Sequence, residues 1–516
     1  MSSYDVIVVG AGSAGAVVAA RLSEDEGRSV LLLESGPDYR SADALEHIRS
    51  IEPGRVMPTR ELADAYTFPH LTATRSAVQE PALYLRGRGV GGSSSINGMF
   101  AIRATVEDFD GWAKAGCTGW SYDEALPLLN AMEDDLDFGD ADYHGDAGPI
   151  PVSRPRREDF FALDAAVDAI AERFGHAWAE DHNAPGTTGV SPYAFNGRDG
   201  RRVSTNDGYL EPARGRTNLT IVGDAHVERV LLTGTRATGV RVRIGDQVTD
   251  IAAAEVVVCA GAIHSPAILQ RSGIGPSALL RGLGIEVVAD LPVGLGLQEH
   301  PGIALELGLK ETPDYRGLPQ RGQVCVRFTT GVGDEPNDAM IAVVGALGIG
   351  LPVAGIAGWG NRVTSTGSVQ ITSTDASVDP QVDFNMLSTD DDLKRFRIIV
   401  DQMRAWAQQP ELTALAAEMG FGDDMVLPDV SMTDREFTAF ALANVGDTVH
   451  ATSTCTMGAP GSADVVVDPA GRVVGVEGLR VADASVLPWT TRANTNLTAI
   501  FVGEQIARRM REETTA

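Results

Sequence analysis

The apolar positions of the chain fall into short strands and longer helical patterns that follow one another in turn. An apolar strand at residues 4–9 leads through glycines into a helical pattern at 16–23, and a second apolar strand spans 29–34. Residues 219–242 alternate in the manner of strands and hairpins, and at 255–272 a strand again leads through glycine into a helix. Strands that alternate with helices predict an α/β fold in which the chain returns to its first sheet.

The turn after the first strand carries three glycines, in the sequence V-G-A-G-S-A-G of residues 9–15. Gly10 lets the chain reverse, Gly12 lets the backbone approach a pyrophosphate, and Gly15 lets helix and strand pack closely. The second strand ends in Glu34, nineteen residues after Gly15, which is the spacing of a carboxylate that binds an adenosine ribose. These features predict a Rossmann-like, dinucleotide-binding domain with phosphates at the helix N-terminus.

A second domain is indicated further along the chain. Residues 323–329, 339–344 and 369–374 have strand patterns, 390–408 predicts a long helix, and 498–511 predicts a final helix. We expect a mixed α/β (α+β) protein in which a discontinuous second domain is built on an antiparallel sheet with helices. The nucleotide-binding domain would comprise residues 1–150, 200–298 and 441–516, and the second domain would comprise 151–199 and 299–440.

Composition narrows the class of protein. Hydrophobic residues make up 43% of the 516 positions and charged residues 22%, as in soluble globular proteins. A net charge of −28 argues against a nucleic-acid or anionic-membrane partner. No apolar run approaches the length of a membrane span, and the first apolar stretch carries the glycine turn in place of a signal-peptide cleavage site. We therefore expect a cytoplasmic protein.

The four cysteines, Cys117, Cys259, Cys325 and Cys455, are widely spaced and form no C-x-x-C pair. Neither a metal cluster nor a disulfide framework is indicated, so we expect no bound metal. Cys455 is expected to pack in the core.

Two more segments carry candidate chemistry. Residues 86–98, R-G-R-G-V-G-G-S-S-S-I-N-G, have neither helical nor strand period, and they predict a loop whose backbone amides wrap a planar or anionic ligand. Residues 450–458, H-A-T-S-T-C-T-M-G, place an imidazole far from the first glycine turn in sequence. A histidine titrates near neutral pH and is suited to proton transfer.

Together these segments resemble the glucose-methanol-choline (GMC) oxidoreductases, FAD enzymes that oxidise alcohols. The resemblance rests on five motifs in order along the chain: 10–15 with Glu34, 91–97, 261–266 with 272–276, 481–488, and 494–498. Residues 303–360 are the least similar part, and in this family substrate specificity usually resides there.

The resemblance implies a set of FAD-binding residues. They are Gly10, Gly12, Ser13, Gly15, Glu34, Arg86, Gly91, Gly92, Ser93, Asn97, Gly98, Met99, Val227, Ala260, Asp483, Ala484, Asn494, Thr495, Asn496 and Thr498. Some relatives attach FAD covalently through a histidine at the position of Ile96. Isoleucine cannot form that bond, so we expect non-covalent FAD.

The resemblance also implies a mechanism. Alcohol oxidation removes a proton from oxygen and a hydride from carbon, so the site needs a base and an acceptor. His450 would take the proton, Asn494 would align the oxygen, and flavin N5 would accept the hydride. We expect Met99, Phe100 and Phe328 to line the substrate pocket.

Other prominent side chains are expected to be structural. His144 and His300 lie in segments that recur across the family away from the flavin, and His264 is expected to pack beside the cofactor. Trp112 and Trp120 are expected to anchor the core.

Alternatives remain at this point. Electrons could pass to oxygen, or to a quinone, a protein or a peptide-derived redox carrier. Aromatic residues make up only 6% of the chain, which disfavours choline and favours a neutral alcohol, sugar or glycoside. A second enzymatic hypothesis for the same fold is a flavin-dependent lyase that cleaves cyanohydrins. A non-enzymatic hypothesis, a degenerate FAD-binding structural protein, is disfavoured because both His450 and Asn494 are present.

Overall fold

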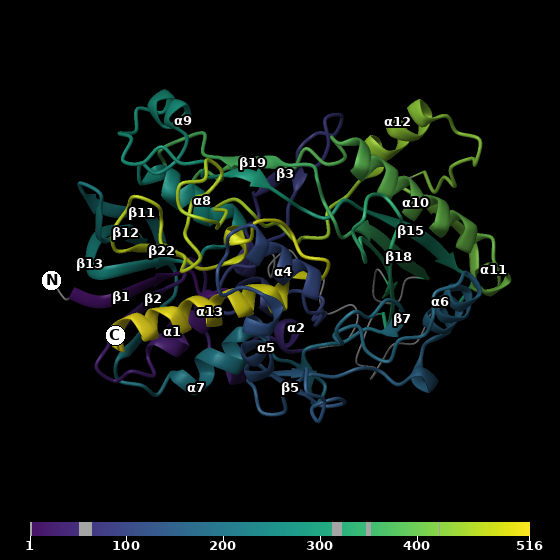
Figure 1. Ribbon diagram of the computed structural model, residues 1–516, viewed down its shortest axis with the longest axis horizontal. Helices are drawn as coiled ribbons and strands as arrows, with labels where there is room; N and C mark the ends of the chain where they lie inside the picture. Colours follow the sequence, from purple (N-terminus) through teal and green to yellow (C-terminus); the bar gives the residue numbers. More distant parts are fainter. Residues whose placement is uncertain (1–2, 51–63, 312–321, 347–351, 423, 516) are drawn as a thin grey trace.

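A seven-stranded sheet with strands from the start, the middle and the end of the chain forms one side of the molecule (Figure 1). The structure, a computed structural model, describes all residues except 1–2, 51–63, 312–321, 347–351, 423 and 516. The strands of this sheet are β1 (Ser3–Val9), β2 (Val30–Leu33), β10 (Leu219–Val222), β11 (Ala225–Thr233), β12 (Arg236–Ile244), β13 (Gln247–Val258) and β22 (Leu479–Val481).

Strand β13 joins the parallel and antiparallel parts of this sheet. Strands β10, β2, β1 and β13 run parallel in that spatial order. On its other edge, the first half of β13 pairs antiparallel with β12, and its last residues, 256–258, pair parallel with β22. The late strand β22 therefore joins the same sheet as the first strands of the chain, with β13 between β22 and β1, as the predicted return to the first sheet requires.

A six-stranded sheet, antiparallel throughout, forms the opposite side of the molecule (Figure 1). Its spatial order is β21 (Ala416–Phe421), β15 (Gly302–Leu309), β18 (Val353–Gly360), β17 (Ala339–Ala346), β16 (Val324–Phe328) and β7 (Gly189–Pro192). The long helix α10 (Asp390–Ala407) and α6 (Ala162–Arg173) pack on it. The mixed α/β fold class with an antiparallel second sheet is therefore confirmed.

A third, five-stranded sheet connects the two parts. Its order is β14 (Leu295–Leu297), β19 (Gly367–Gln370), β20 (Gln381–Asp383), β3 (Thr72–Thr74) and β4 (Ala82–Leu83). It combines strands from both expected domains, so the domain boundaries given above stay a prediction.

The remaining elements are further helices and two short strand pairs. The other helices are α1 (Gly15–Leu22), α2 (Glu46–Arg49), α4 (Val106–Lys114), α5 (Tyr122–Ala131), α7 (Glu211–Ala213), α8 (Gly261–Arg271), α9 (Ser277–Gly282), α11 (Pro410–Leu415), α12 (Asp434–Asn444) and α13 (Thr495–Thr515). Two small pairs are β5 (Glu133–Asp135) with β6 (Ile150–Val152), and β8 (Gly197–Arg198) with β9 (Arg201–Arg202).

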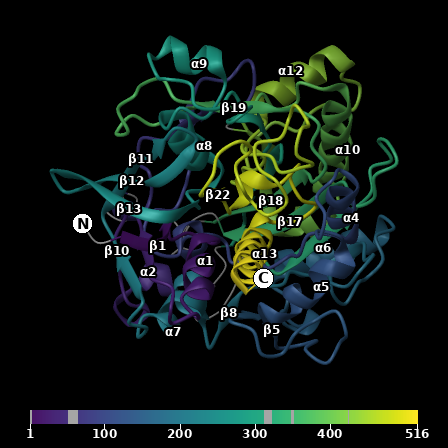
Figure 2. The same cartoon turned by 60° about the vertical axis from the view of Figure 1, so that its left-hand side comes forward.

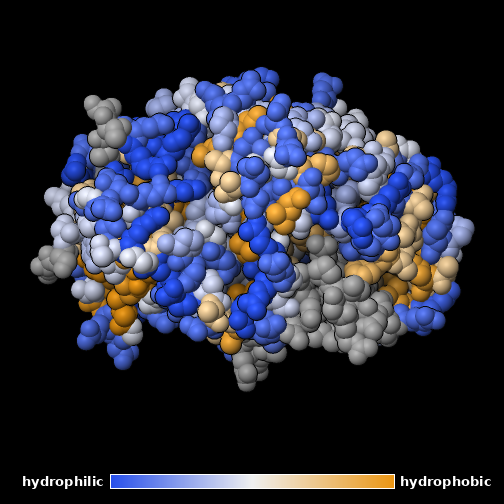
Figure 3. Space-filling model, turned by 90° about the horizontal axis from the view of Figure 1, so that it is seen from below, coloured by the Kyte–Doolittle hydropathy of each residue, from blue (hydrophilic) through white to orange (hydrophobic). Residues whose placement is uncertain are grey.

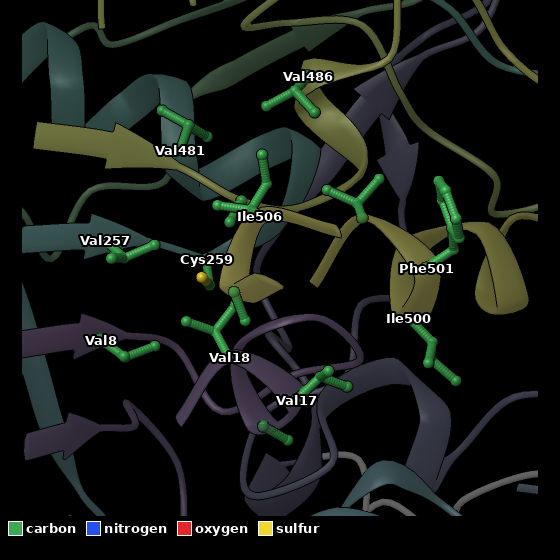
Figure 4. Close-up of a cluster of buried hydrophobic side chains, with 14 of the residues drawn as sticks. Val8, Val17, Val18, Val257, Cys259, Val481, Val486, Ile500, Phe501 and Ile506 are labelled. Carbon is green, nitrogen blue, oxygen red and sulfur yellow. The ribbon is translucent and has the colours of Figure 1, made fainter. Parts of the chain in front are cut away.

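The first and last helices of the chain pack side by side (Figures 1 and 2). Apolar side chains of α1, α13 and the seven-stranded sheet form one buried cluster that includes Val8, Val17, Val257 and Phe501 (Figure 4). Burying each such side chain contributes about 1.5–3 kcal/mol. Trp112 and Trp120 are fully buried in the same core, which confirms that they anchor it.

The face drawn in Figure 3 is largely hydrophilic, with apolar residues in scattered patches. A hydrophilic surface is consistent with the net charge of −28. Among the described residues, no helix is both long and apolar enough to cross a membrane.

His144 lies in a buried charge network outside the lining of the main cavity described below. Its Nδ1 lies 2.5 Å from Glu133 Oε1 and its Nε2 2.8 Å from Asp181 Oδ2. The network consists of Glu133, Asp135, Asp181, Arg103 and Arg154 together with His144. Three acids face two arginines, so a protonated His144 balances the charge, as a structural role requires.

Burial alone would lower the pKa of His144, but the hydrogen bonds to Asp181 and Glu133 outweigh it and raise the pKa above its usual 6.5. A histidine whose pKa rises on folding stabilises the fold below the unfolded pKa, and this stabilisation disappears as pH rises through the folded pKa. We predict that His144→Gln lowers the free energy of unfolding by about 3 kcal/mol at pH 6, because it leaves a buried acid uncompensated. The deficit relative to wild type should narrow towards pH 9 in thermal or urea unfolding.

His176→Gln is the matched control, because burial lowers the pKa of His176 and that side chain is already neutral above pH 7. Its stability deficit should stay constant between pH 7 and 9. A deficit for His144→Gln that is equally constant would show that His144 is not charged in the fold.

Candidate active site

A cavity of about 530 Å³ is lined both by the first glycine turn and by His450. Most of the predicted site residues line it: Gly10, Gly12, Ser13, Glu34, Arg86, Gly92, Ser93, Asn97, Gly98, Phe100, Val227, Ala260, His450, Asp483, Ala484, Asn494, Thr495 and Asn496. The structure therefore brings together segments from the start, the middle and the end of the chain around one cavity.

The carboxylate of Glu34 ties the glycine turn to the neighbouring loops. Its Oε2 accepts a hydrogen bond from Ala11 N at 2.8 Å, and its Oε1 accepts from Gly36 N at 2.8 Å and Gly89 N at 2.9 Å. A carboxylate oxygen has two lone pairs, so Oε2 can accept a further hydrogen bond from a group in the cavity. A ribose hydroxyl is such a group.

The two glycine-rich segments touch directly. Gly92 has φ +50°, and a Cβ placed there would lie 2.7 Å from Gly12 Cα. Gly12 itself has open space towards the cavity, with the nearest neighbour of an added Cβ at 4.0 Å. The contact leaves a cradle of bare backbone beside the N-terminus of α1, which suits the phosphates of a dinucleotide.

Five predicted residues do not line the cavity, namely Gly15, Gly91, Met99, Thr498 and Phe328. Gly15 packs beneath the turn, since a Cβ there would lie 1.9 Å from Gly10 O. Gly91 donates its N–H to Ala11 O at 2.8 Å and so joins the loop to the turn. Thr498 and Met99 are buried in the surrounding protein. Gly15, Gly91, Thr498 and Met99 therefore belong to the protein that surrounds the cavity, and they do not form its lining.

The expectation that Phe328 lines the substrate pocket is corrected. In β16, Val324, Val326 and Phe328 point into the core beneath the helices of the six-stranded sheet, while Cys325 points to the other face. The Phe328 ring lies 5.3 Å from that of His176. Alternation of side chains along the strand puts Phe328 on the face away from the cavity.

His450 and Asn494 face each other in the cavity. The distance from Asn494 Nδ2 to His450 Nε2 is 3.3 Å, and Tyr193 donates its hydroxyl to Asn494 Oδ1 at 2.7 Å. An amide N–H can only donate, so His450 Nε2 accepts and carries its lone pair on the side of Asn494. Nε2 is therefore the nitrogen that can take up a proton.

His300, which is expected from the sequence to be structural and away from the flavin, is in direct contact with His450. His300 Nδ1 lies 3.0 Å from His450 Nδ1, and its Nε2 lies 2.8 Å from the carbonyl of Thr491. Burial lowers the pKa of His300 to about 4. Burial, helped by His300 and Arg86, also lowers the pKa of His450 well below its usual range. Both imidazoles are thus neutral at pH 7, the state that a proton acceptor needs.

Hydrophobic side chains form the walls near His450. The Phe100 and Tyr193 rings stack with centroids 3.9 Å apart, and Trp359 of β18 also lines the cavity. The aliphatic lining residues in this sheet are Ala342, Val343, Val344 and Ala357. No local sequence pattern identifies Tyr193 or Trp359 as lining residues. Tyr193, for example, contacts Asn494, which lies 301 residues away in the sequence.

The backbone next to His450 is strained. Val449, which lines the cavity, has φ +58°, a left-handed conformation that is rare for a β-branched residue and costs about 1–3 kcal/mol. Its N–H donates to Asp447 Oδ1 at 3.2 Å, and its carbonyl accepts from the guanidinium of Arg86. Arg75 holds Asp447 in turn at 2.6 Å. The surrounding ion pair and hydrogen bonds hold the chain in this conformation.

Near Glu34 the lining contains side chains that the motifs did not mark. His264 stacks on Phe68 with ring centroids 4.1 Å apart, in keeping with the expected packing role. His226 and Arg271 also line this cavity. On the cavity side of α8, Asp483 Oδ2 accepts from Gly261 N at 2.9 Å and from Ser265 Oγ at 2.5 Å, which fixes the Asp483 carboxylate.

The sequence as a whole identifies the family. A family model described as GMC oxidoreductase matches residues 4–302, and a second with the same description matches 363–503. The chain belongs to the GMC oxidoreductase family of FAD-dependent enzymes, which act on CH–OH donors. The interval 303–362 between the two matches contains the strands of the apolar wall, and it coincides with the segment that the sequence motifs leave uncovered.

Individual relatives resemble the chain over its full length. It is 35% identical over 525 residues to the 5-(hydroxymethyl)furfural oxidase of Methylovorus sp. strain MP688, covering 98% of both chains. It is 37% identical over 551 residues to an oxygen-dependent choline dehydrogenase of Pseudomonas fluorescens strain Pf0-1, covering 98% of this chain and 94% of that one. The crystal structure of pyridoxine 4-oxidase from Mesorbium loti matches with a TM-score of 0.88 at 28% identity, covering 99% of both chains.

The contact between the two glycine segments predicts a defect in cofactor content. Gly92→Ala would force a Cβ against Gly12 Cα, so the purified variant should carry less than about a tenth of the wild-type FAD, because displaced backbone no longer fits the phosphates. Gly234→Ala is the matched control, because Gly234 also has a positive φ, +60°, but its Cβ would meet nothing within 4 Å. The ratio of flavin to protein absorbance checks this, and equal FAD content in the two variants would contradict it.

Proposed function

We propose that the protein oxidises a neutral primary alcohol, carried on a small aromatic or similarly apolar group, to the corresponding carbonyl compound. The observation that carries the proposal is the 3.3 Å approach of His450 Nε2 and Asn494 Nδ2 in the cavity that also contains the glycine turn and Glu34. A base and an amide donor beside a dinucleotide site are the groups that alcohol oxidation needs.

The residues of the cavity fit FAD. The cradle at Gly12 and Gly92 would hold the pyrophosphate, Glu34 Oε2 the adenosine ribose, and the lining residue Val227 would lie against adenine. Bound FAD supplies the acceptor for the hydride that leaves the alcohol carbon. Ile96 lines the cavity and offers no atom for a covalent link, which supports non-covalent FAD.

The protein's own groups would handle the hydroxyl. A substrate oxygen about 3 Å from both His450 Nε2 and Asn494 Nδ2 can give its proton to the first and accept a hydrogen bond from the second. Tyr193 holds the Asn494 amide with its N–H₂ towards His450, because it occupies the amide oxygen. The neutral state of His450 makes it ready to accept the proton without prior deprotonation.

The apolar wall supports an aromatic or apolar alcohol over a sugar. Phe100, Tyr193 and Trp359 line the cavity with largely apolar side chains, whereas a polyhydroxylated substrate would need many polar partners. The relatives named for 5-(hydroxymethyl)furfural and pyridoxine act on small rings that bear hydroxymethyl groups. This substrate class lies within the neutral alcohols expected from the sequence.

Choline is a second candidate because of the choline dehydrogenase relatives. A quaternary ammonium group favours aromatic rings together with a carboxylate. Among the described lining residues near His450, the acid is Asp447, and Arg75 already neutralises it. The structure therefore favours an uncharged substrate.

Oxidation of alcohols can be measured through the colour of bound flavin. We predict that 5-(hydroxymethyl)furfural or benzyl alcohol bleaches the flavin anaerobically faster than choline or glucose, and that His450→Ala slows bleaching at least about 100-fold. His70→Ala, an exposed histidine, is the control and should behave as wild type. Return of colour in air indicates oxygen as acceptor, and lasting bleaching indicates another carrier. Undiminished bleaching by His450→Ala would refute its role as base.

The mode of FAD attachment gives a separate test. Acid precipitation of the purified protein should leave the yellow flavin in the supernatant, because Ile96 cannot anchor it. Ile96→Leu should release flavin equally. A yellow pellet would contradict non-covalent binding.

A further inference from the structure

The hydroxyl of Thr448 lies between a buried carboxylate and the proposed base. Thr448 Oγ1 is 2.9 Å from Glu299 Oε1 and 2.8 Å from His450 Nδ1. Thr448 also lines the cavity, and it precedes His450 by two residues. None of the five motifs that carry the family resemblance includes Thr448 or Glu299.

The directions of the hydrogen bonds around Glu299 follow from its partners. Its carboxylate accepts from the backbone N–H groups of His300 at 2.9 Å and His450 at 2.6 Å, and from the Tyr84 hydroxyl at 2.8 Å. Burial and nearby Asp447 raise the pKa of Glu299 to about 7, while the donated hydrogen bonds favour the carboxylate. Thr448 donates its hydroxyl hydrogen to Glu299 Oε1, and this is the direction that the carboxylate form of Glu299 requires, because a carboxylate can only accept.

The tautomer of His450 follows in the same way. Because Nε2 accepts from the Asn494 amide, a neutral His450 carries its proton on Nδ1. Thr448 Oγ1 still has lone pairs to accept from Nδ1–H. His300 donates from its Nε2 to the Thr491 carbonyl, so its Nδ1, 3.0 Å away, is a second acceptor for the same hydrogen.

We propose that Thr448 is a positioning residue that links Glu299 to His450, holds the proton of the base on Nδ1 and leaves Nε2 free to take the proton of the alcohol. The inference rests on the proposed function only in naming His450 as the base. When Nε2 gains a proton, the Nδ1 proton stays in place, and the positive ring is stabilised by Glu299 through the hydroxyl. A carboxylate thus assists the base without entering the cavity.

Several charged or titratable groups surround this link. His300 and Tyr84 contact Glu299 or His450, Arg86 lies near both, and Asp447 is paired with Arg75. These groups are unchanged by substitution at Thr448. A shift in the pH profile that depends on the hydroxyl can therefore be assigned to the link.

Thr448→Val and Thr448→Ser form a matched pair that tests this role. Valine keeps the shape of threonine and lacks the hydroxyl, whereas serine keeps the hydroxyl. We expect Thr448→Val to lower the rate constant of anaerobic flavin reduction about tenfold or more, and Thr448→Ser to stay within about threefold of wild type, because one buried hydrogen bond to a charged group is lost only in the first. FAD content and KM should be the same in both variants as in wild type.

The pH dependence separates positioning from a structural effect. Loss of the link removes the stabilisation of the protonated ring, so the acid limb of kcat/KM should move to lower pH in Thr448→Val and stay in place in Thr448→Ser. If Thr448→Val and Thr448→Ser have the same rate of flavin reduction and the same acid limb of kcat/KM, while the wild type is active, the positioning role is overturned. The proposed function would stand in that case.

A readout without turnover keeps the two proposals distinct. In protein labelled with ¹⁵N in the histidine rings, the His450 signals, assigned by their loss in His450→Gln, should show the Nδ1–H tautomer in wild type and Thr448→Ser. Thr448→Val should show a mixture. The Nε2–H tautomer in wild type would overturn the inference, whereas a correct tautomer in a protein that oxidises no alcohol would count against the proposed function alone.

Discussion

Helix α13 packs on α1 so closely that the two ends of a 516-residue chain share one core, and the rest of the site depends on this contact. Gly503 allows it, since a Cβ there would lie 2.7 Å from Ala14 O. Ser13 Oγ donates to Asn496 Oδ1 at 2.9 Å and aligns the first turns of both helices. Because the N-termini of both helices line the cavity, the cradle for the phosphates and the amide of Asn494 keep a fixed relation to each other.

The parts of the site that the sequence predicts are those set by local backbone constraints. Positive φ at Gly10 and the close approach at Gly15 restrict those positions to glycine. The strand, turn and helix can therefore be predicted from a short stretch of sequence. Contacts such as Tyr193 with Asn494, or His300 with His450, join positions 150 to 301 residues apart and leave no local pattern. They depend on how the two large sheets pack.

The misplacement of Phe328 has a related cause. Every residue of β16 is buried, so the strand shows no alternation of apolar and polar residues from which its two faces could be told apart. The same ambiguity affects β17 and β18, which supply the apolar wall. These strands lie in the interval between the two family matches, so His450, inside the second match, adjoins strands that neither family model covers.

The four free cysteines are all buried, and Cys259 even lines the cofactor cavity. Burial raises the pKa of the Cys259 and Cys455 thiols, and both are therefore held as neutral S–H groups. Oxidants attack the thiolate form far more readily than the thiol. The Cys259 sulfur, although it lines the cofactor cavity, is therefore held in the form that reacts slowly with oxidants.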